Sequence, residues 1–314
     1  MTTQVSSPQP AILIESLVKR FKGHLGIRTY TAVDGLSFAV ETGGICGFLG
    51  PNGAGKTTTL KVLMDLIRPD AGRVEIFGQP PGERAVKARL GYLPETPYFY
   101  DQLSGRELLH YFAELHGVER NVFGKRSAEL LEMVGMTRAA DRRLRTYSKG
   151  MLQRIGMAQA LIGDPELVVL DEPMTGLDPI GRSEFRAIIL NLKARGKTVL
   201  FSSHILADAQ ALCDRVIIIH KSKLVAQGTV PELLRDTDAK VRVTINGLEP
   251  GNWHSPFALE SRQPGSLSFL VADHAAGDAL VRQAISAGGR VNGYEALLPD
   301  LETVFIRHVS GGEK

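Results

Sequence analysis

The chain has 314 residues, 43% of them hydrophobic, with 37 lysines and arginines against 34 aspartates and glutamates. This length suits one large domain or two modest ones, and the apolar content is sufficient for a sizeable core. The net charge of +3 is spread along the chain without a block of like charge, so nothing indicates a nucleic-acid partner.

The first segment, MTTQVSSPQP, is polar and rich in Pro and Ser, and we predict a disordered tail over residues 1–10. It lacks the basic start and apolar run of a signal peptide. No segment approaches the roughly 18 consecutive apolar residues of a membrane span. We therefore expect a chain that is cytosolic and soluble by itself.

Strands are predicted next. The segments AILIESLVKRF (11–21) and YTAVDGLSFAV (30–40) are expected to form an antiparallel sheet, and GICGFLG (44–50) is expected to form a strand that leads into a Gly-rich loop. A helix should follow from Lys56 to about Ile67. The order strand, Gly-rich loop, helix is typical of a phosphate-binding site.

The loop GPNGAGKT (50–57) has the residue types that such a site needs. Glycines allow backbone N–H groups to turn toward phosphate oxygens, Lys56 supplies positive charge to the β and γ phosphates, and the Thr57 hydroxyl can ligate Mg²⁺. The alternative is a Gly-rich turn that binds nothing.

Between about residues 98 and 160 apolar residues recur at helical spacing, which predicts a helical insertion before the next strand. Within it, Ser148 and Gly150 stand at the start of a helix. A capping serine and a free helix N-terminus attract anions. An ordinary N-cap explains the same pattern.

Two short apolar runs end in polar residues, as expected of buried parallel strands with functional groups at their carboxyl ends. ELVVLDEP (166–173) delivers Asp171 and Glu172, where Asp171 can hold Mg²⁺ and Glu172 can polarise an attacking water. TVLFSSH (198–204) ends in His204, which either reaches a γ-phosphate or serves as a structural hydrogen-bonding group.

RVIIIHKSKLVAQG (215–228) predicts two strands around a tight turn, and the main domain, 11–235, should end after a short helix. For residues 236–314 we predict a small α+β domain of the order β-β-α-β with a closing helix. Its role is open between a stabilising appendage and a regulatory or dimerising module.

Five motifs then combine into a resemblance: the phosphate loop at 50–58, GYLPE at 91–95, YSKGM at 147–151, TGLDP at 175–179, and His204. Over about 11–230 the sequence resembles an ATP-binding subunit of an ABC transporter. The resemblance implies an α/β P-loop NTPase with a parallel core sheet, an antiparallel N-terminal β-subdomain and the helical insertion. It also implies ATP and Mg²⁺ as the bound species.

The resemblance implies a head-to-tail homodimer, or a dimer with a sister ATPase subunit, in which each ATP lies between one chain's phosphate loop and the other chain's signature segment. Glu172 would be the general base, and His204 would hold the γ-phosphate. Asp171 and Thr57 would serve Mg²⁺. The loop residues implied in nucleotide binding are Gly50, Pro51, Asn52, Gly53, Ala54, Gly55, Lys56, Thr57 and Thr58. Ser148 and Gly150 would face the γ-phosphate bound by the partner chain. Asp178 would communicate across the dimer.

The sequence departs from the family pattern at two places. Tyr147, Lys149 and Met151 occupy variable places of the signature, while Ser148 remains. Glu95 stands where the family usually has a Mg²⁺-binding glutamine, and it would contact Mg²⁺ or its water. For the aromatic residue that stacks on adenine, both Phe21 and Tyr30 are candidates.

The segments GYLPE, YSKGM, DEPMTGLDP and LPDLETVF are similar to the branch of ABC subunits that serves type-two exporters of drugs, antibiotics and lipids. That branch pairs the subunit with a separate membrane permease, which implies a position on the cytoplasmic face of the membrane. The alternatives are a soluble ABC ATPase acting on ribosomes or DNA, and a regulator that binds nucleotide without hydrolysing it.

Overall fold

The computed structural model describes residues 9–22, 29–235, 240–248, 253, 255–297 and 300–310. The predicted disordered tail lies outside the described residues, apart from Gln9 and Pro10. The chain divides into two compact units, Met1–Val230 and Pro231–Lys314. Within the described ranges, no helix combines the length and apolar character required to cross a bilayer.

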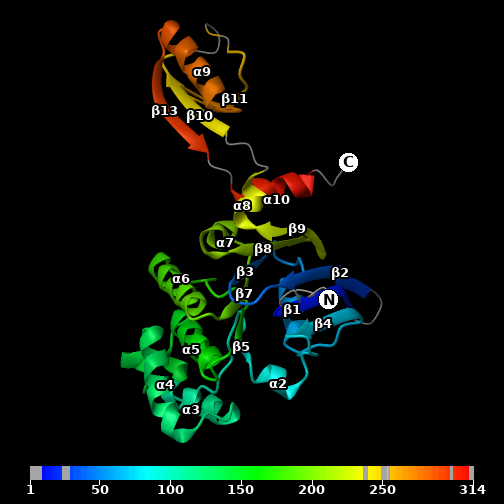
Figure 1. The fold of residues 1–314 in the computed structure, drawn as a ribbon. Coiled ribbons are helices and arrows are strands. Elements are labelled where there is room, and N and C mark those ends of the chain that lie inside the picture. The colour runs from blue at the N-terminus through cyan, green and yellow to red at the C-terminus, as the bar shows by residue number, and fades with distance from the viewer. Residues whose placement is uncertain are drawn as a thin grey trace, which may run out of the picture. The chain divides into compact units, whose positions relative to one another are not determined.

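The core of the first unit is a six-stranded sheet of order β5-β6-β7-β3-β8-β9, parallel except for β9 (Figure 1). The runs predicted as buried strands form β3, β6 and β7 and are buried along most of their length, as in parallel sheets with both faces covered. Their carboxyl ends meet at one edge. The strands are β3 (Ile45–Leu49), β5 (Leu90–Leu93), β6 (Leu167–Leu170), β7 (Thr198–Ser203), β8 (Arg215–His220) and β9 (Lys223–Thr229).

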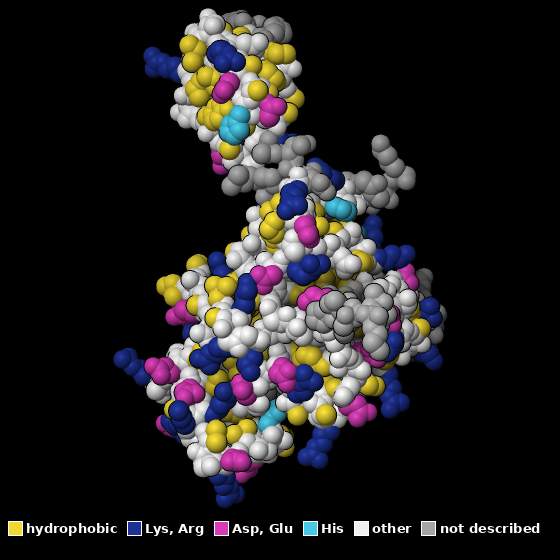
Figure 2. Space-filling view, viewed as in Figure 1, with side chains coloured by type: hydrophobic (Ala, Val, Ile, Leu, Met, Phe, Trp, Pro, Cys, Tyr) yellow, Lys and Arg dark blue, Asp and Glu magenta, His cyan; other side chains and the backbone are white. Residues whose placement is uncertain are grey.

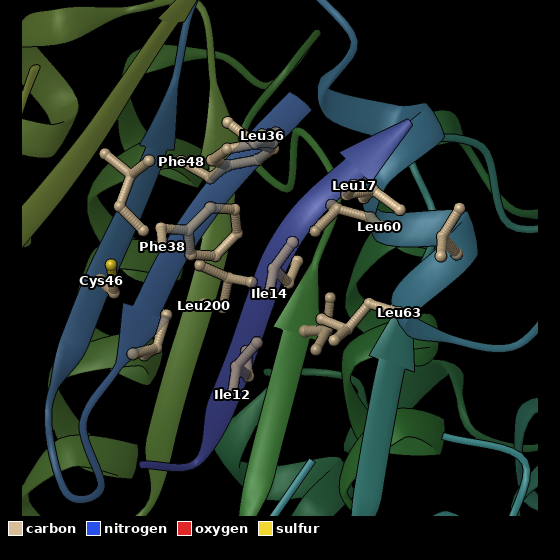
Figure 3. Packing of buried hydrophobic residues seen from close by; sticks show 14 of the residues in the cluster. Ile12, Ile14, Leu17, Leu36, Phe38, Cys46, Phe48, Leu60, Leu63 and Leu200 are labelled. Atoms are coloured by element: carbon tan, nitrogen blue, oxygen red, sulfur yellow. The ribbon is translucent and has the colours of Figure 1, made fainter. Parts of the chain in front are cut away.

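An antiparallel sheet of order β2-β1-β4 packs against this core. It consists of β1 (Ile12–Lys22), β2 (Thr29–Val40) and β4 (Ala71–Ile76), and the predicted pairing of the first two strands is confirmed. Figure 3 shows Ile12, Ile14 and Leu17 of β1 among the labelled apolar side chains of the shared core. Burial of this cluster fixes β2 beside the loop that follows β3.

The helix after the phosphate loop, α1 (Lys56–Leu63), is shorter than predicted. Asp65 adopts a left-handed backbone with φ of 56°, a conformation that ends helices, so the segment to Ile67 does not continue the helix. The predicted helical insertion is confirmed as α3 (Gly105–Leu115), α4 (Arg120–Met133) and α5 (Lys149–Leu161). The other α-helices described in this unit are α2 (Arg84–Lys87), α6 (Pro179–Ala194) and α7 (Leu206–Leu212), and α8 (Val230–Arg235) spans the division between the units. Two short 3-10 helices, Thr137–Ala139 and Leu144–Thr146, lie between α4 and α5.

The second unit holds a four-stranded antiparallel sheet of order β11-β12-β10-β13, with α9 (His274–Ser286) packed on it. The sequence prediction missed β11 (Leu259–Gln263), because this strand is short, polar and exposed along its whole length and so has no apolar alternation. The order is β-β-β-α-β. The remaining elements are β10 (Lys240–Asn246), β12 (Ser266–Val271), β13 (Arg290–Leu297) and α10 (Leu301–Ser310).

The single tryptophan of the chain reports on this second unit, since the Trp253 ring lies 5.6 Å from that of Phe269 in its core. Leu280 of α9 is fully buried in the same core. We expect Leu280→Ala to lower the free energy of unfolding of this unit by about 2–5 kcal/mol, because it leaves a cavity. Urea unfolding followed by tryptophan fluorescence measures it. Ile285→Ala, on the exposed side of α9, is the control, and equal midpoints for the two variants would contradict the described packing.

Candidate functional site

A cavity of about 410 Å³ opens at the carboxyl edge of the parallel sheet. One wall is most of the loop and helix start at 52–58, and a second is formed by Tyr30, Thr31 and Ala32 of β2. Segments far apart in the chain complete it with Glu95, Glu172, Thr175 and His204. The sheet therefore brings the predicted phosphate loop, the carboxylate strand end and His204 to one place.

The shape of the loop depends on glycines at positions that exclude a side chain. Gly55 has a φ of 103°, and a Cβ there would lie 2.4 Å from the Ala32 carbonyl oxygen. At Gly50 a Cβ would lie 2.4 Å from the Ile219 carbonyl oxygen. The loop thus packs its backbone directly against β2 and β8, which leaves its N–H groups available to turn toward the cavity.

Lys56, the first residue of α1, is 6% exposed. Its Nζ donates to the carbonyl oxygens of Gly50 at 2.7 Å and Pro51 at 3.3 Å, and lies 3.2 Å from Oε1 of Glu172. A buried cation needs such partners. The ammonium group is therefore held at the centre of the loop, against the carboxylate strand end.

Asp171 directly follows β6 and is 1% exposed. Burial raises the pKa of its carboxyl, while hydrogen bonds from the hydroxyls of Ser202 and Thr57 act in the opposite direction. Both hydroxyls donate to the same oxygen, Oδ1, at 2.6 Å and 3.3 Å. This network links the start of α1 to the ends of β6 and β7.

Glu172 has a left-handed backbone with φ of 47°, and its N–H donates to Ser202 Oγ at 2.9 Å. Its Oε2 accepts a hydrogen bond from Thr175 Oγ1 at 3.1 Å and lies 2.8 Å from Nδ1 of His204. In the described part of the chain its Oε1 has no hydrogen-bond donor and has only the ion pair with Lys56. The carboxylate is thus oriented by three side chains at the cavity wall.

The oxygens of Thr57 and Asp171 fit a Mg²⁺ site with few protein ligands. Oγ1 of Thr57 and Oδ1 of Asp171 are 3.3 Å apart, and hard oxygen donors are what Mg²⁺ prefers. No group of three His, Cys, Asp or Glu side chains that could hold a metal occurs among the described residues. Two protein oxygens suit an ion that takes its other ligands from substrate phosphates and water.

The structure places the other predicted residues as follows. Tyr30 lines the cavity, whereas Phe21 does not, and the rings of Phe21 and Tyr30 stack with their centroids 5.5 Å apart. Glu95 lines the cavity from an exposed loop. The signature residues Ser148 and Gly150 do not line it, nor does Asp178. Residues 23–28, which separate Phe21 from Tyr30 in the chain, lie outside the described residues.

Ser148 and Asp178 instead cap helices. The Ser148 hydroxyl accepts from the N–H of Met151 at the start of α5, and Oδ1 of Asp178 accepts from the N–H of Gly181 at the start of α6. Both side chains lie on the exposed surface of this chain.

Two residues in the network were missed by the sequence prediction. Thr175 and Ser202 orient the carboxylates, and both lie inside segments that had been singled out, TGLDP and TVLFSSH. The sequence shows only that each is a hydroxyl residue within three positions of a predicted site residue, Glu172 or His204, which does not reveal its partner.

Comparison with known proteins gives consistent matches. The profile of the family described as ABC transporter matches residues 33–175. An uncharacterised ABC transporter ATP-binding protein of Synechocystis sp. is 44% identical over 278 residues, which cover 87% of this chain and 77% of that protein. The daunorubicin resistance ATP-binding protein DrrA3 of Streptomyces coeruleorubidus is 36% identical over 293 residues, covering 90% of this chain and 92% of that protein.

A solved structure of an ATP-binding subunit of an ABC transporter is similar to this chain with a TM-score of 0.64 and 30% sequence identity. The match covers 72% of this chain and 92% of that chain. The predicted α/β fold of the P-loop class is confirmed by this similarity.

The loop geometry predicts that alanine at Gly55 and alanine at Gly53 weaken ATP binding to different extents. Gly55→Ala should weaken ATP binding by about tenfold or more, equivalent to about 1.4 kcal/mol, because the new Cβ meets the β2 backbone. Gly53→Ala carries a similar left-handed strain of about 1–2 kcal/mol but has no atom within 4 Å of its Cβ, so it should weaken binding less. Titration with a fluorescent ATP analogue measures both, and circular dichroism checks the fold. Equal loss in both variants would contradict the close approach at Gly55.

Proposed function

The chain belongs to the ABC transporter family as one of the ATP-binding subunits, which hydrolyse ATP and work with membrane permease subunits. From this premise we propose that it is the ATPase of an exporter. Two such subunits close on two ATP molecules and open after hydrolysis, and this cycle drives a separate permease. The second subunit is another copy or a sister ATPase, and the assembly sits on the cytoplasmic face of the membrane.

The observation that supports an ATP site shared between two subunits is the composition of the cavity. It contains the phosphate loop, Glu172 and His204, but not the signature residues Ser148 and Gly150. Ser148 lies exposed at the N-terminus of α5, where the helix dipole and free N–H groups favour an anion. A second subunit that presents its Ser148 to this cavity would complete the site.

In the proposed reaction Glu172 acts as the general base and polarises the water that attacks the γ-phosphate. Thr175 and His204 hold its Oε2, so the carboxylate keeps one orientation. Bound phosphates offer Lys56 a second anionic partner, which weakens its pairing with Glu172 and frees Oε1 for the water. His204 also contacts the γ-phosphate.

Thr57 and Asp171 are the proposed protein ligands of Mg²⁺, which when bound neutralises charge on the phosphates. Glu95 reaches the same cavity and is proposed to contact the ion or its water. Tyr30 is the proposed adenine contact, since it lines the cavity and is 58% exposed. Phe21 supports it by ring stacking.

We assign the permease contact to an apolar groove of about 310 Å³ beside the Glu95 loop. Its lining includes Tyr98, Phe99 and Phe112, and Tyr98 is 90% exposed. Exposed aromatic side chains beside a groove are typical of protein interfaces. Because one loop carries both Glu95 and Tyr98, contact with the permease and the state of the cavity are connected through a short segment.

The exporter assignment rests on similarity to a relative named for daunorubicin resistance and on the motifs shared with type-two exporter subunits. The face of the molecule shown in Figure 2 does not favour a role on nucleic acid. Figure 2 shows Lys and Arg side chains interspersed with Asp and Glu over the visible face, which is unlike a basic nucleic-acid groove.

Glu172→Gln tests the proposed base. The variant should bind ATP with near wild-type affinity but turn it over about 10²–10⁴ times more slowly, because glutamine cannot accept the proton. Phosphate release and equilibrium nucleotide binding measure the two effects. Glu166→Gln, an exposed carboxylate directly before β6, is the matched control. Turnover by Glu172→Gln equal to that of the control would overturn the assignment.

Complementation tests the shared site. Lys56→Ala and Ser148→Ala should each be nearly inactive, yet a mixture should recover roughly a quarter of wild-type turnover if half of the pairs are mixed and each holds one intact site. The recovery is expected because the Lys56→Ala chain still offers an intact Ser148 to the intact loop of its partner. Steady-state ATPase activity of the mixture measures it. A mixture as inactive as its components would show that Ser148 does not complete the partner's site.

A further inference from the structure

Ser202 occupies a special position between the strand ends of the cavity. It is fully buried near the end of β7. The parallel register of β6 and β7 pairs Leu170 with Phe201, so the next residues along each strand are Asp171 and Ser202. The hydroxyl therefore lies beside the backbone turn that delivers the two carboxylates.

The direction of both Ser202 hydrogen bonds is fixed by chemistry. The N–H of Glu172 can only donate, so Ser202 Oγ accepts from it at 2.9 Å. A serine hydroxyl has one proton, and Oδ1 of Asp171 at 2.6 Å receives it. One hydroxyl thus holds the side chain of one carboxylate residue and the backbone of the next.

The backbone bond matters because Glu172 is a non-glycine residue in the left-handed region, with φ of 47°. Such a conformation is strained and persists only where surrounding contacts hold it. Without the Ser202 hydroxyl this buried N–H loses the partner that it has at this turn. The direction of the Glu172 side chain toward Thr175 and His204 depends on the same turn.

We propose that Ser202 is a positioning residue for ATP hydrolysis, which sets Asp171 Oδ1 beside Thr57 and holds the Glu172 turn. This inference rests on the proposed roles of Asp171 in Mg²⁺ binding and of Glu172 as base. The neighbouring Ser203 differs, since within the described part of the chain its hydroxyl bonds locally, to the backbone N–H and carbonyl oxygen of Ile205. The two adjacent serines therefore form a matched pair for experiment.

The experiment compares full-length wild type, Ser202→Ala and Ser203→Ala. Affinity for a fluorescent non-hydrolysable ATP analogue is measured with Mg²⁺ and with a chelator, alongside kcat, KM and thermal unfolding. In the wild type Mg²⁺ should tighten binding. Ser202→Ala should lose most of this Mg²⁺ effect and about 10–100-fold in kcat, as when a residue that orients a metal ligand is removed, while affinity in chelator stays near wild type.

In Ser203→Ala any change should affect binding with and without Mg²⁺ equally, so the ratio of the two affinities stays at the wild-type value. If Ser202→Ala does not fold, Ser202→Cys keeps the shape of the side chain with a slightly larger atom, but its thiol is only a weak donor and acceptor, and the same loss is expected. A Ser202 variant with the wild-type affinity ratio and kcat would overturn the inference. A wild type without any Mg²⁺ effect would instead overturn the proposed Mg²⁺ site.

Discussion

The burial of two adjacent carboxylates at the end of β6 is the constraint on which the rest of the site depends. Asp171 and Glu172 are 1% and 6% exposed, and charged groups so placed are costly unless they meet cations or hydrogen-bond donors. Their partners come from the start of α1, the end of β7 and the segment after β6. Burial of the two carboxylates therefore requires the fold to bring these three segments together.

The strand order meets this requirement. β7 lies between β6 and β3, so a residue of β7 lies directly beside the carboxylates, and the helix that follows β3 also contacts them. The residue from β7 is Ser202, and the residues from the start of that helix are Lys56 and Thr57. The consequence is a rigid set of oxygens and one cation whose arrangement depends on the central sheet rather than on mobile loops. The proposed hydrolysis needs this preorganisation, because phosphoryl transfer is accelerated mainly by positioning and electrostatics.

The elements that carry strong local signals could be predicted from the sequence. The strand and helix on either side of the Gly-rich loop, the buried strands around it and the helical insertion each have a local sequence pattern, and these elements are confirmed. Two features could not be predicted: β11, whose exposed side chains show no periodic pattern, and the early end of α1, which depends on the left-handed backbone of Asp65.

The role of Ser202 could not be predicted for a different reason. Its importance comes from the register between β6 and β7, which are separated by a whole helix, and no local pattern encodes that pairing.

The signature segment shows why a structural and a functional explanation of one residue need not compete. Ser148 caps α5 by accepting a hydrogen bond from Met151, and this leaves its own proton available to donate to an anion. The next residue, Lys149, stands in the first turn of the helix, where a cation is opposed by the helix dipole and where no acidic residue of this turn offsets it. An ordinary cap does not require that lysine. The proposed half-site, in which this segment would meet the phosphates of a nucleotide bound to another subunit, would give the unfavourable charge an anionic partner and so would account for both residues at once.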